Sequence, residues 1–378
     1  MTEERKSGGD TRQSAVKSGI QRVEFDRDMG FQQTLRQRVD EYFRSTGRRK
    51  RDCWQMYLKT AVVFAAFGTS YALLLLVAAT LWQGLLLSVL LALCIAAIGF
   101  NVMHDGGHQA YSEHAWVNRL MAWTLDLSGS SSGRWRWKHG VIHHMYVNIT
   151  GYDDDINLCL LGRLSPHQKR RWWHRWQHLY IWFFYGMMAI KWQLFDDFRY
   201  VITGRLGRNR VPRPLGWEIV IFVLGKLLFF AWAFAIPMLL HPVWTVVFYY
   251  AVTATVLGST LTTVFIIPHL VEKADFPMPQ KGTERMARSW AVHQATVTVN
   301  FAMKSRILTL VLGGLNYHKE HHFFPMICHV NYPGMSRVVE ETCREFGVPY
   351  NTYDTFAAGV AAHYRWIRGL GRSDQERA

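Results

Sequence analysis

The stretch from residue 61 to residue 82, AVVFAAFGTSYALLLLVAATLW, decides the fold. It runs for 22 residues without a charged side chain. At a helical rise of about 1.5 Å per residue, this length is enough to cross a hydrocarbon layer about 30 Å thick. The stretch therefore predicts a membrane-spanning helix.

Three more apolar stretches follow, at residues 84–103, 219–240 and 243–267. Only one residue separates the first span from the second, and only His241 and Pro242 separate the third from the fourth. Helices that are apolar on all sides belong in a membrane rather than in a soluble core. We therefore expect an all-α integral membrane protein with four transmembrane helices arranged as two hairpins.

Basic residues set the expected orientation. They cluster at 48–51 (RRKR), 169–175 (KRRWWHR) and 205–213 (RLGRNRVPR), while the two hairpin turns contain no Lys or Arg. By the positive-inside rule, both termini and the segment between the hairpins are cytoplasmic. This topology explains the net charge of +15 better than nucleic-acid binding does, because no nucleic-acid-binding motif accompanies the charge. The basic surface could also attract acidic lipid or an acidic protein partner.

Residues 178–195, HLYIWFFYGMMAIKWQLF, are nearly long enough to form a fifth span. They include His178, Lys191 and Gln193 and are rich in Trp and Tyr, which favour membrane interfaces. We expect a helix that lies on the membrane surface.

The five cysteines are scattered and form no CxxC pair. They predict neither a disulfide framework nor a zinc site, and they suit a reducing cytosol. Their positions are Cys53, Cys94, Cys159, Cys328 and Cys343.

Histidines recur in three short boxes, HDGGH at 104–108, HGVIHH at 139–144 and HKEHH at 318–322. Positions i, i+3 and i+4 share one face of a helix, so each box can direct two or three imidazoles at one point. Four spans with cytoplasmic termini place all three boxes on one side of the membrane. A fifth span at 178–195 would separate the last box from the others, which favours four spans.

The boxes contain eight imidazoles, more than the four ligands that close a structural zinc site. Imidazole also binds iron, copper and nickel, so residue type does not choose the metal. The number of ligands predicts two metal ions. Most of the other histidines are explained more simply as satisfied polar residues at the membrane surface: His114, His167, His174, His178, His241, His269, His329 and His363.

The segments FNVMHDGGHQAYS, LDLSGSSSGRWRWKHGVIHHMYVNITGYDDDI and GGLNYHKEHHFFPMICHVNYP resemble the membrane fatty acid desaturase family. They are most similar to its bacterial linoleoyl-CoA and front-end branch, although His318 stands where that branch usually has Gln. The resemblance covers about residues 60 to 355. It implies a desaturase domain at 58–360, followed by a C-terminal tail at 361–378. The segment before it, residues 1–57, is expected to be cytoplasmic from its charge and partly disordered from its polar composition.

The same resemblance implies the site. The box histidines would hold two iron ions within a cytoplasmic helical cap, with a ninth ligand from WAVHQATVTVNF at His293. Nearby polar residues would orient the ligands or hold an iron-bound water. The implied metal ligands are His104, His108, His139, His143, His144, His293, His318, His321 and His322, and the supporting residues are Asp105, Asp153, Asp154, Asp155 and Asn316.

The implied enzyme is an O2-dependent fatty acyl desaturase that introduces a cis double bond into a long-chain acyl-CoA or acyl-lipid and reduces O2 to water. The chain would lie in an apolar tunnel lined by the second and fourth spans and the aromatic surface helices. Lys226, inside the third span, is expected to extend to the interface.

A cytochrome b5 motif (HPGG) and a nucleotide-binding glycine fingerprint are both missing from the sequence, so the electrons should come from a separate ferredoxin, cytochrome b5 or similar carrier. A bacterial inner membrane is the expected location, rather than endoplasmic reticulum. A lipid hydroxylase or other monooxygenase on the same scaffold and a histidine-rich metal transporter remain alternatives. Chain length, double-bond position and acyl carrier stay open.

Overall fold

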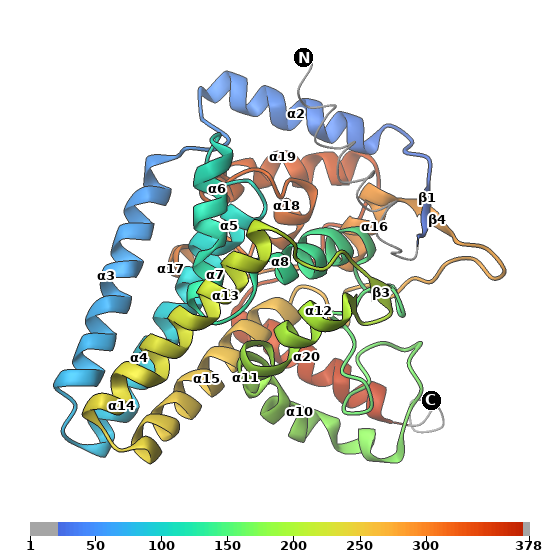
Figure 1. Cartoon of the computed structure of the whole chain (residues 1–378). Helices are drawn as coiled ribbons and strands as arrows, with labels where there is room; N and C mark the ends of the chain where they lie inside the picture. The colour runs from blue at the N-terminus through green and yellow to red at the C-terminus, as the bar shows by residue number, and fades with distance from the viewer. Residues whose placement is uncertain (1–21, 373–378) are drawn as a thin grey trace.

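The computed structural model describes residues 22–372, and the first apolar stretch forms helix α3 (Trp54–Leu76) (Figure 1). This helix begins seven residues before the expected span and ends six residues before its expected end. The chain turns at 77–80 because Thr80 caps the next helix. Its side-chain oxygen accepts from the backbone N–H of Gln83 at 3.3 Å, and the Gln83 side chain accepts from the Thr80 N–H at 3.1 Å.

Four helices within residues 22–372 are long and apolar enough to cross a membrane. The helix α4 is the central one, packing against both α3 and α15, and 56% of the residues in its most apolar stretch are buried, against 6% for α3. A helical membrane protein with four candidate spans is therefore confirmed. The spans consist of α3; α4 (Leu81–Ile98), the π-helical segment η1 (Gly99–Met103) and α5 (His104–Gly107); α13 (Trp217–Phe230), π-helical η5 (Ala231–Ala235) and α14 (Ile236–Leu240); and α15 (Val243–Ile266).

The turns at 77–80 and 241–242 lie at the same end of these helices, and the other helices gather at the opposite end and along one side (Figure 1). These other helices are α2 (Phe31–Thr46), α6 (Ala115–Ala122), α7 (Thr124–Leu127), α8 (Ser132–Trp135), η2 (Arg136–His143), α9 (His144–Tyr146), η3 (Trp172–Trp176), α10 (Gln177–Gly186), α11 (Met188–Lys191), η4 (Trp192–Asp196), α12 (Asp197–Thr203), α16 (Trp290–Val297), α17 (Arg306–Val311), α18 (His318–Phe323), η6 (His329–Asn331), α19 (Tyr332–Glu345) and α20 (Phe356–Gly371).

The strands within residues 22–372 are short and form three two-stranded sheets. Two of these sheets join segments that are distant in the sequence, and the third is a local hairpin. The parallel pairs are β1 (Glu24–Asp26) with β4 (Arg285–Ser289) and β5 (Asn300–Phe301) with β6 (Thr352–Tyr353), and the antiparallel pair is β2 (Arg205–Leu206) with β3 (Asn209–Arg210).

The expected surface helix at 178–195 is divided into α10, α11 and η4, and it is not among the four candidate spans. One side of α10 packs against α15 and α20, where Ile181 and Tyr185 are buried. The outward side is also apolar: Leu179 is 61% exposed and Phe183 67% exposed. An outward apolar surface of this kind suits contact with lipid.

Helices beyond both expected boundaries of the desaturase domain pack into the fold. The helix α2, which precedes residue 58, packs against α19, and α20 continues through the expected boundary at residue 360. His363 in α20 is buried and contacts the Tyr185 hydroxyl at 3.0 Å. Residues 361–371 are therefore part of the folded unit, whereas the expected disorder before residue 22 and the last six residues lie outside the described part of the chain.

Lys226 does not extend to the interface as expected. Its ammonium is buried and donates to the Gly129 carbonyl (2.6 Å), the Gln193 carbonyl (2.7 Å) and the Asp197 carboxylate (2.9 Å). A buried cation of this kind is tolerated because each contact supplies an oxygen acceptor. Lys226 thus fastens α13 to α12 and to the segment after α7.

Candidate metal centre

The third histidine box forms α18 (His318–Phe323), a helix whose six residues are all buried. Lys319 donates to two backbone carbonyls at the C-terminal end of α16. Glu320 accepts from Asn300 at 2.9 Å and from the Tyr350 hydroxyl at 2.5 Å. Because Lys319 and Glu320 form these hydrogen bonds on the side of the helix away from the histidines, they fix the rotation of the helix about its axis.

The first box begins where the π-helical segment η1 ends. Gly313 approaches this segment so closely that a Cβ there would collide with the backbone carbonyl of Phe100. Its φ of +58° also lies in the left-handed region that favours glycine. The close approach brings the chain leading to α18 beside the first box.

The second box lies mainly in a π-helix, η2, rather than in the α-helix that the spacing indicates. The wider π turn stacks the rings of His139 and His143, with centroids 5.0 Å apart and planes 18° from parallel. Short π-helical segments often occur at functional sites. The irregular helix thus directs both imidazoles the same way.

The structure brings all eight box histidines into one buried cluster. The cluster contains several groups of residues that could each hold a metal ion, and within each group the possible ligand atoms lie within 4.8 Å of one another. His318 contacts the second group, because its Nε2 lies 2.9 Å from Nε2 of His269. Three groups consist of histidines alone: His104, His108, His139 and His321; His143, His269 and His322; and His144, His321 and His322. A fourth combines His139 and His143 with Asp155.

The ninth histidine of the cluster is His269, not the expected His293. His269 Nδ1 contacts the Val297 carbonyl at 3.1 Å, and Asn148 donates to the His269 carbonyl at 2.9 Å. His293 instead contacts the Val147 carbonyl through Nε2 at 3.0 Å and belongs to none of the groups. His269 follows the end of the fourth span much as His104 follows the apolar part of the second. This parallel in the sequence could have identified His269 as a member of the cluster.

Burial keeps most of these imidazoles neutral. It lowers the pKa well below the ordinary value for His108, His144, His269, His318, His321 and His322, and it lowers the pKa of His139 to about 4. For His143, burial acts in the same direction, but the carboxylates of Asp153 and Asp155 outweigh it and raise the pKa. Neutral imidazole is the form that binds metal ions.

The arrangement fits bound cations. The buried Nε2 atoms of His104, His108 and His322 have no hydrogen-bond partner within residues 22–372. Other Nε2 atoms face each other, with His144 3.3 Å from His139 and 3.1 Å from His321. At a metal–nitrogen distance of about 2.1 Å, two ligands of one ion lie about 3.0 to 3.4 Å apart. The separations therefore match shared ligation.

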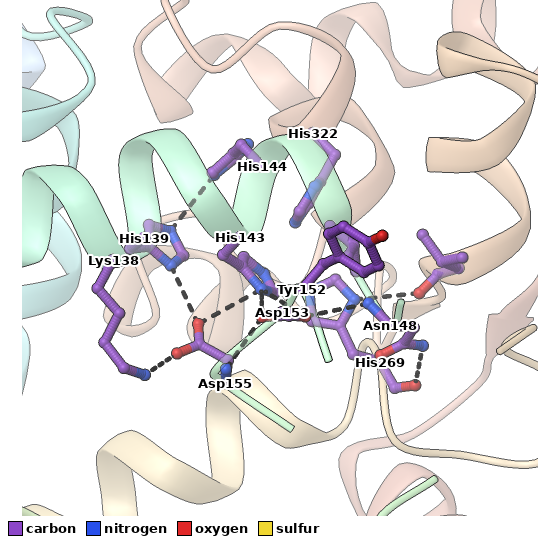
Figure 2. A network of polar contacts seen from close by, with 12 residues as sticks. Lys138, His139, His143, His144, Asn148, Tyr152, Asp153, Asp155, His269 and His322 are labelled. Atoms are coloured by element: carbon purple, nitrogen blue, oxygen red, sulfur yellow. Dashed lines mark hydrogen bonds and ion pairs between the residues drawn. The ribbon is translucent and has the colours of Figure 1, made fainter. Parts of the chain in front are cut away.

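Two of the expected supporting carboxylates contact the cluster (Figure 2). Asp153 lies 3.2 Å from Nδ1 of His143 and also accepts the backbone N–H of Asn148 at 3.0 Å. Asp155 lies 3.4 Å from the same Nδ1 and forms an ion pair with Lys138. Both carboxylates can accept the ring N–H and so leave Nε2 of His143 free for a metal.

The other expected supporting residues are placed differently. Asp105 accepts from the ring and the backbone N–H of His329, each at 3.0 Å, and lies 4.0 Å from Nδ1 of His104. Asp154 accepts from Asn157 at 3.4 Å and contacts none of the box histidines closely enough for a hydrogen bond. Asn316 donates to the Thr309 hydroxyl at 2.9 Å, which leaves its buried Oδ1 without a partner among the described residues.

Two supporting residues were missed by the sequence analysis. Gln294 accepts from Nδ1 of His322 at 2.9 Å and donates to the His144 carbonyl at 3.0 Å. The Tyr332 hydroxyl lies 3.3 Å from Nδ1 of His321. No spacing rule points to either residue, because each is brought to the cluster only by the packing of α16 and α19 against α18.

A largely apolar cavity of about 140 Å³ lies beneath the cluster and is lined in part by His139, His143 and His269. A second cavity, of about 350 Å³, lies between the spans. The two share Ile95, Gln193 and Leu257 as lining residues. They follow the second and fourth spans, where the acyl tunnel was expected.

A membrane protein that directs a buried imidazole cluster at an apolar cavity has the design of a metal-dependent enzyme acting on lipid chains. The chain belongs to the fatty acid desaturase family, whose model matches residues 79–354. It is therefore an oxidoreductase that desaturates fatty acyl chains. Membership implies iron-dependent catalysis, a lipid substrate and an electron donor.

Curated relatives resemble the chain over most of its length. The sn-1 linoleoyl-lipid 6-desaturase of Synechocystis sp. is 34% identical over 354 residues, covering 93% of this chain and 99% of the relative. The enzyme of the same name from Arthrospira platensis is 34% identical over 370 residues, with coverage of 96% and 98%. The acyl-lipid (8-3)-desaturase of Physcomitrium patens is 33% identical over 348 residues, covering 91% of this chain and 72% of the relative.

Proposed function

We propose that this desaturase introduces a cis double bond into an acyl chain esterified to a membrane lipid, between an existing double bond and the carboxyl end. The observation that carries the proposal is the cavity beneath His139, His143 and His269, which shares lining residues with a second cavity between the spans. The names of the relatives, a linoleoyl-lipid 6-desaturase and an acyl-lipid (8-3)-desaturase, support the lipid carrier and the front-end position.

The eight box histidines and His269 would hold two iron ions. Bound iron supplies the oxidising power, drawn from O2 and donor electrons, that removing two hydrogens from an unactivated alkyl chain requires. The protein's own contribution is to hold the acyl chain and the metal ligands in the right positions. Asp153, Gln294 and Tyr332 each contact the Nδ1 atom of one histidine and so direct its Nε2 toward the metal. The apolar cavity holds the chain next to these imidazoles and excludes water.

The remaining proposals concern topology and partners. The basic segments at 48–51, 169–175 and 205–213 support two hairpins whose helical cap, active site and termini are cytoplasmic, in a bacterial inner membrane. A separate ferredoxin, cytochrome b5 or similar carrier would supply electrons by docking on this basic side. Complementary charge would speed that encounter.

The test is expression in a bacterial host supplied with linoleate but unable to desaturate it further. Gas chromatography and mass spectrometry should find a product lacking two hydrogens, with its new double bond nearer the carboxyl end. The His322→Ala variant, expressed to the same level, is the inactive control. A product that has gained oxygen would instead identify a hydroxylase, and metal accumulation without any lipid product would identify a transporter.

Lipid analysis then shows whether the acyl chain is desaturated on a glycerolipid or on CoA. In a pulse of labelled linoleate, the new product should appear first in glycerolipids that already contained labelled linoleate, and only later in the acyl-CoA pool. The opposite order would contradict the acyl-lipid assignment while leaving desaturation itself intact.

A further inference from the structure

Two cysteines that lie 275 residues apart in the sequence meet beside the metal centre. Cys53 directly precedes α3, and Cys328 follows the third box and directly precedes η6. Their sulfur atoms are 3.2 Å apart. The Cys328 backbone N–H donates to the Lys50 carbonyl at 2.9 Å, which holds the two segments together. This pairing was not expected from the scattered cysteines of the sequence.

The surroundings give the two sulfurs different roles. The Cys328 thiol donates a hydrogen bond to Cys53, and the Asn331 amide donates to both sulfurs, at 3.4 Å for Cys328 and 3.7 Å for Cys53. The hydrogen bond from Cys328 is the largest cause that lowers the pKa of Cys53 to about 7. The same bond, together with burial, raises the pKa of Cys328. Of the two thiols, Cys53 is therefore the one that ionises more readily.

Solvent access also makes Cys53 the more reactive of the two cysteines. Cys53 is partly exposed, whereas Cys328 is buried. Hydrogen bonds from Cys328 and Asn331 favour the Cys53 thiolate, and the nearby carboxylates of Asp105 and Asp52 act against it. A reactive cysteine needs thiolate character and solvent access, and a second thiol within reach resolves its oxidised form. Cys53 has both, and Cys328 is the second thiol.

We propose that Cys53 and Cys328 form a hydroperoxide-reactive dithiol site that closes to a reversible disulfide. The Cys53 thiolate attacks one peroxide oxygen, the O–O bond breaks, and the leaving hydroxide takes a proton to become water. The sulfur of Cys328 then attacks the Cys53 sulfenic acid. The S–S bond forms, the S–O bond breaks, and the departing hydroxide takes the Cys328 proton as a second water. Two thiols are oxidised and one peroxide is reduced.

Closure would join the start of α3 to the segment after the third box. His329, next to Cys328, contacts Asp105, and Asp105 is the neighbour of His104. Oxidation of the dithiol site would therefore take place close to the metal cluster, to which it is connected through His329 and Asp105.

The experiment uses the full-length protein purified in detergent, reduced, desalted and treated with hydrogen peroxide in small excess. Thiols are counted by gel shift with a polymer-linked maleimide after denaturation. We expect labelling to fall from five cysteines to three and to return after dithiothreitol, and a peptide map should join Cys53 to Cys328. Diamide, which removes the same two electrons without peroxide, should give the same pair.

Variants make the assignment specific. Cys159→Ser removes an exposed cysteine outside the pair and should still lose two thiols on oxidation. Cys53→Ser should lose none, and Cys328→Ser should accumulate a dimedone-reactive sulfenic acid at Cys53. Labelling that stays at five in the wild-type protein, or a map that joins another pair, would overturn the proposal. The wild-type map decides the question even if a variant fails to fold.

Discussion

Every imidazole of the cluster has two ring nitrogens, and where a partner occupies Nδ1 the other nitrogen is left for metal. The partners are a carboxylate for His143, an amide for His322, a phenol for His321 and a backbone carbonyl for His269. A partner that binds one ring nitrogen fixes both the tautomer and the ring orientation. At the scale of residues, these partners determine where the neutral nitrogens point.

A matched pair of variants tests which histidine completes the centre. We expect His269→Ala to lower bound iron and abolish desaturation, because it removes an Nε2 that faces His318 at 2.9 Å. His293→Ala should retain most of its iron, because its ring contacts a backbone carbonyl and lies outside the groups of ligand atoms. Elemental analysis of the purified variants measures this directly. Iron loss in His293→Ala with full retention in His269→Ala would reverse the assignment.

Gln294 provides a second residue-scale prediction. Gln294→Leu removes the acceptor for Nδ1 of His322, so iron affinity should fall by about 10- to 100-fold. Gln294→Glu keeps an oxygen acceptor and should bind iron more tightly than Gln294→Leu. Iron titration of both variants, with circular dichroism to establish equal helix content, separates lost orientation from misfolding. Equal affinities in the two variants would show that the contact does not orient His322.

The sequence could indicate that the histidines within each box would converge, because their spacing is local. Positions three and four residues apart in a helix or π-helix converge without help from the rest of the fold. His269 is isolated in the sequence, and Gln294 and Tyr332 reach the cluster only through contacts between helices. Such contacts depend on tertiary packing, which a single sequence does not reveal.

At the scale of elements, hydrophobic length predicted the four spans, but the helix ends depended on local capping and charge pairing. Thr80 and Gln83 start α4 three residues earlier than the apolar run suggests. Lys226 interrupts an apolar helix, and the sequence alone does not indicate that Asp197 will be beside it. The break of residues 178–195 into three helical segments likewise follows from their packing on α15.

The crossing of α10 and α15 gives an element-scale prediction. A Cβ at Gly258 would collide with the backbone carbonyl of Gly186, so Gly258→Ala should separate the two helices. We expect a loss of about 1 to 3 kcal/mol, the usual cost of overpacking, and reduced activity because Gly258 also lines the cavity beneath the cluster. Gly68→Ala on α3 is the matched control, since nothing lies within 4 Å of the position that its Cβ would take. Thermal stability in detergent should fall for Gly258→Ala alone.

At the scale of the whole molecule, the metal cluster constrains the topology. The first box lies at the end of the second span, the second box follows that span and the third follows the fourth, yet their imidazoles meet in one buried cluster. Such a cluster is compatible only with an even number of crossings between residues 144 and 318. The candidate spans α13–α14 and α15 would supply two, so we expect the segment from α10 to α12 to remain on one side.

A pair of reporter fusions tests this constraint. A phosphatase or fluorescent reporter placed after Asp197 and one placed after Ala378 should report the same compartment, which we expect to be the cytoplasm because the basic segments lie on that side. A third fusion within the turn at 77–80 should report the opposite compartment and serves as the control for correct insertion. Opposite signals from the first two fusions would mean that α10–α12 crosses the membrane. In that case, the third box could not join the other two in a functional centre, since a buried cluster cannot draw its ligands from both sides of a lipid bilayer.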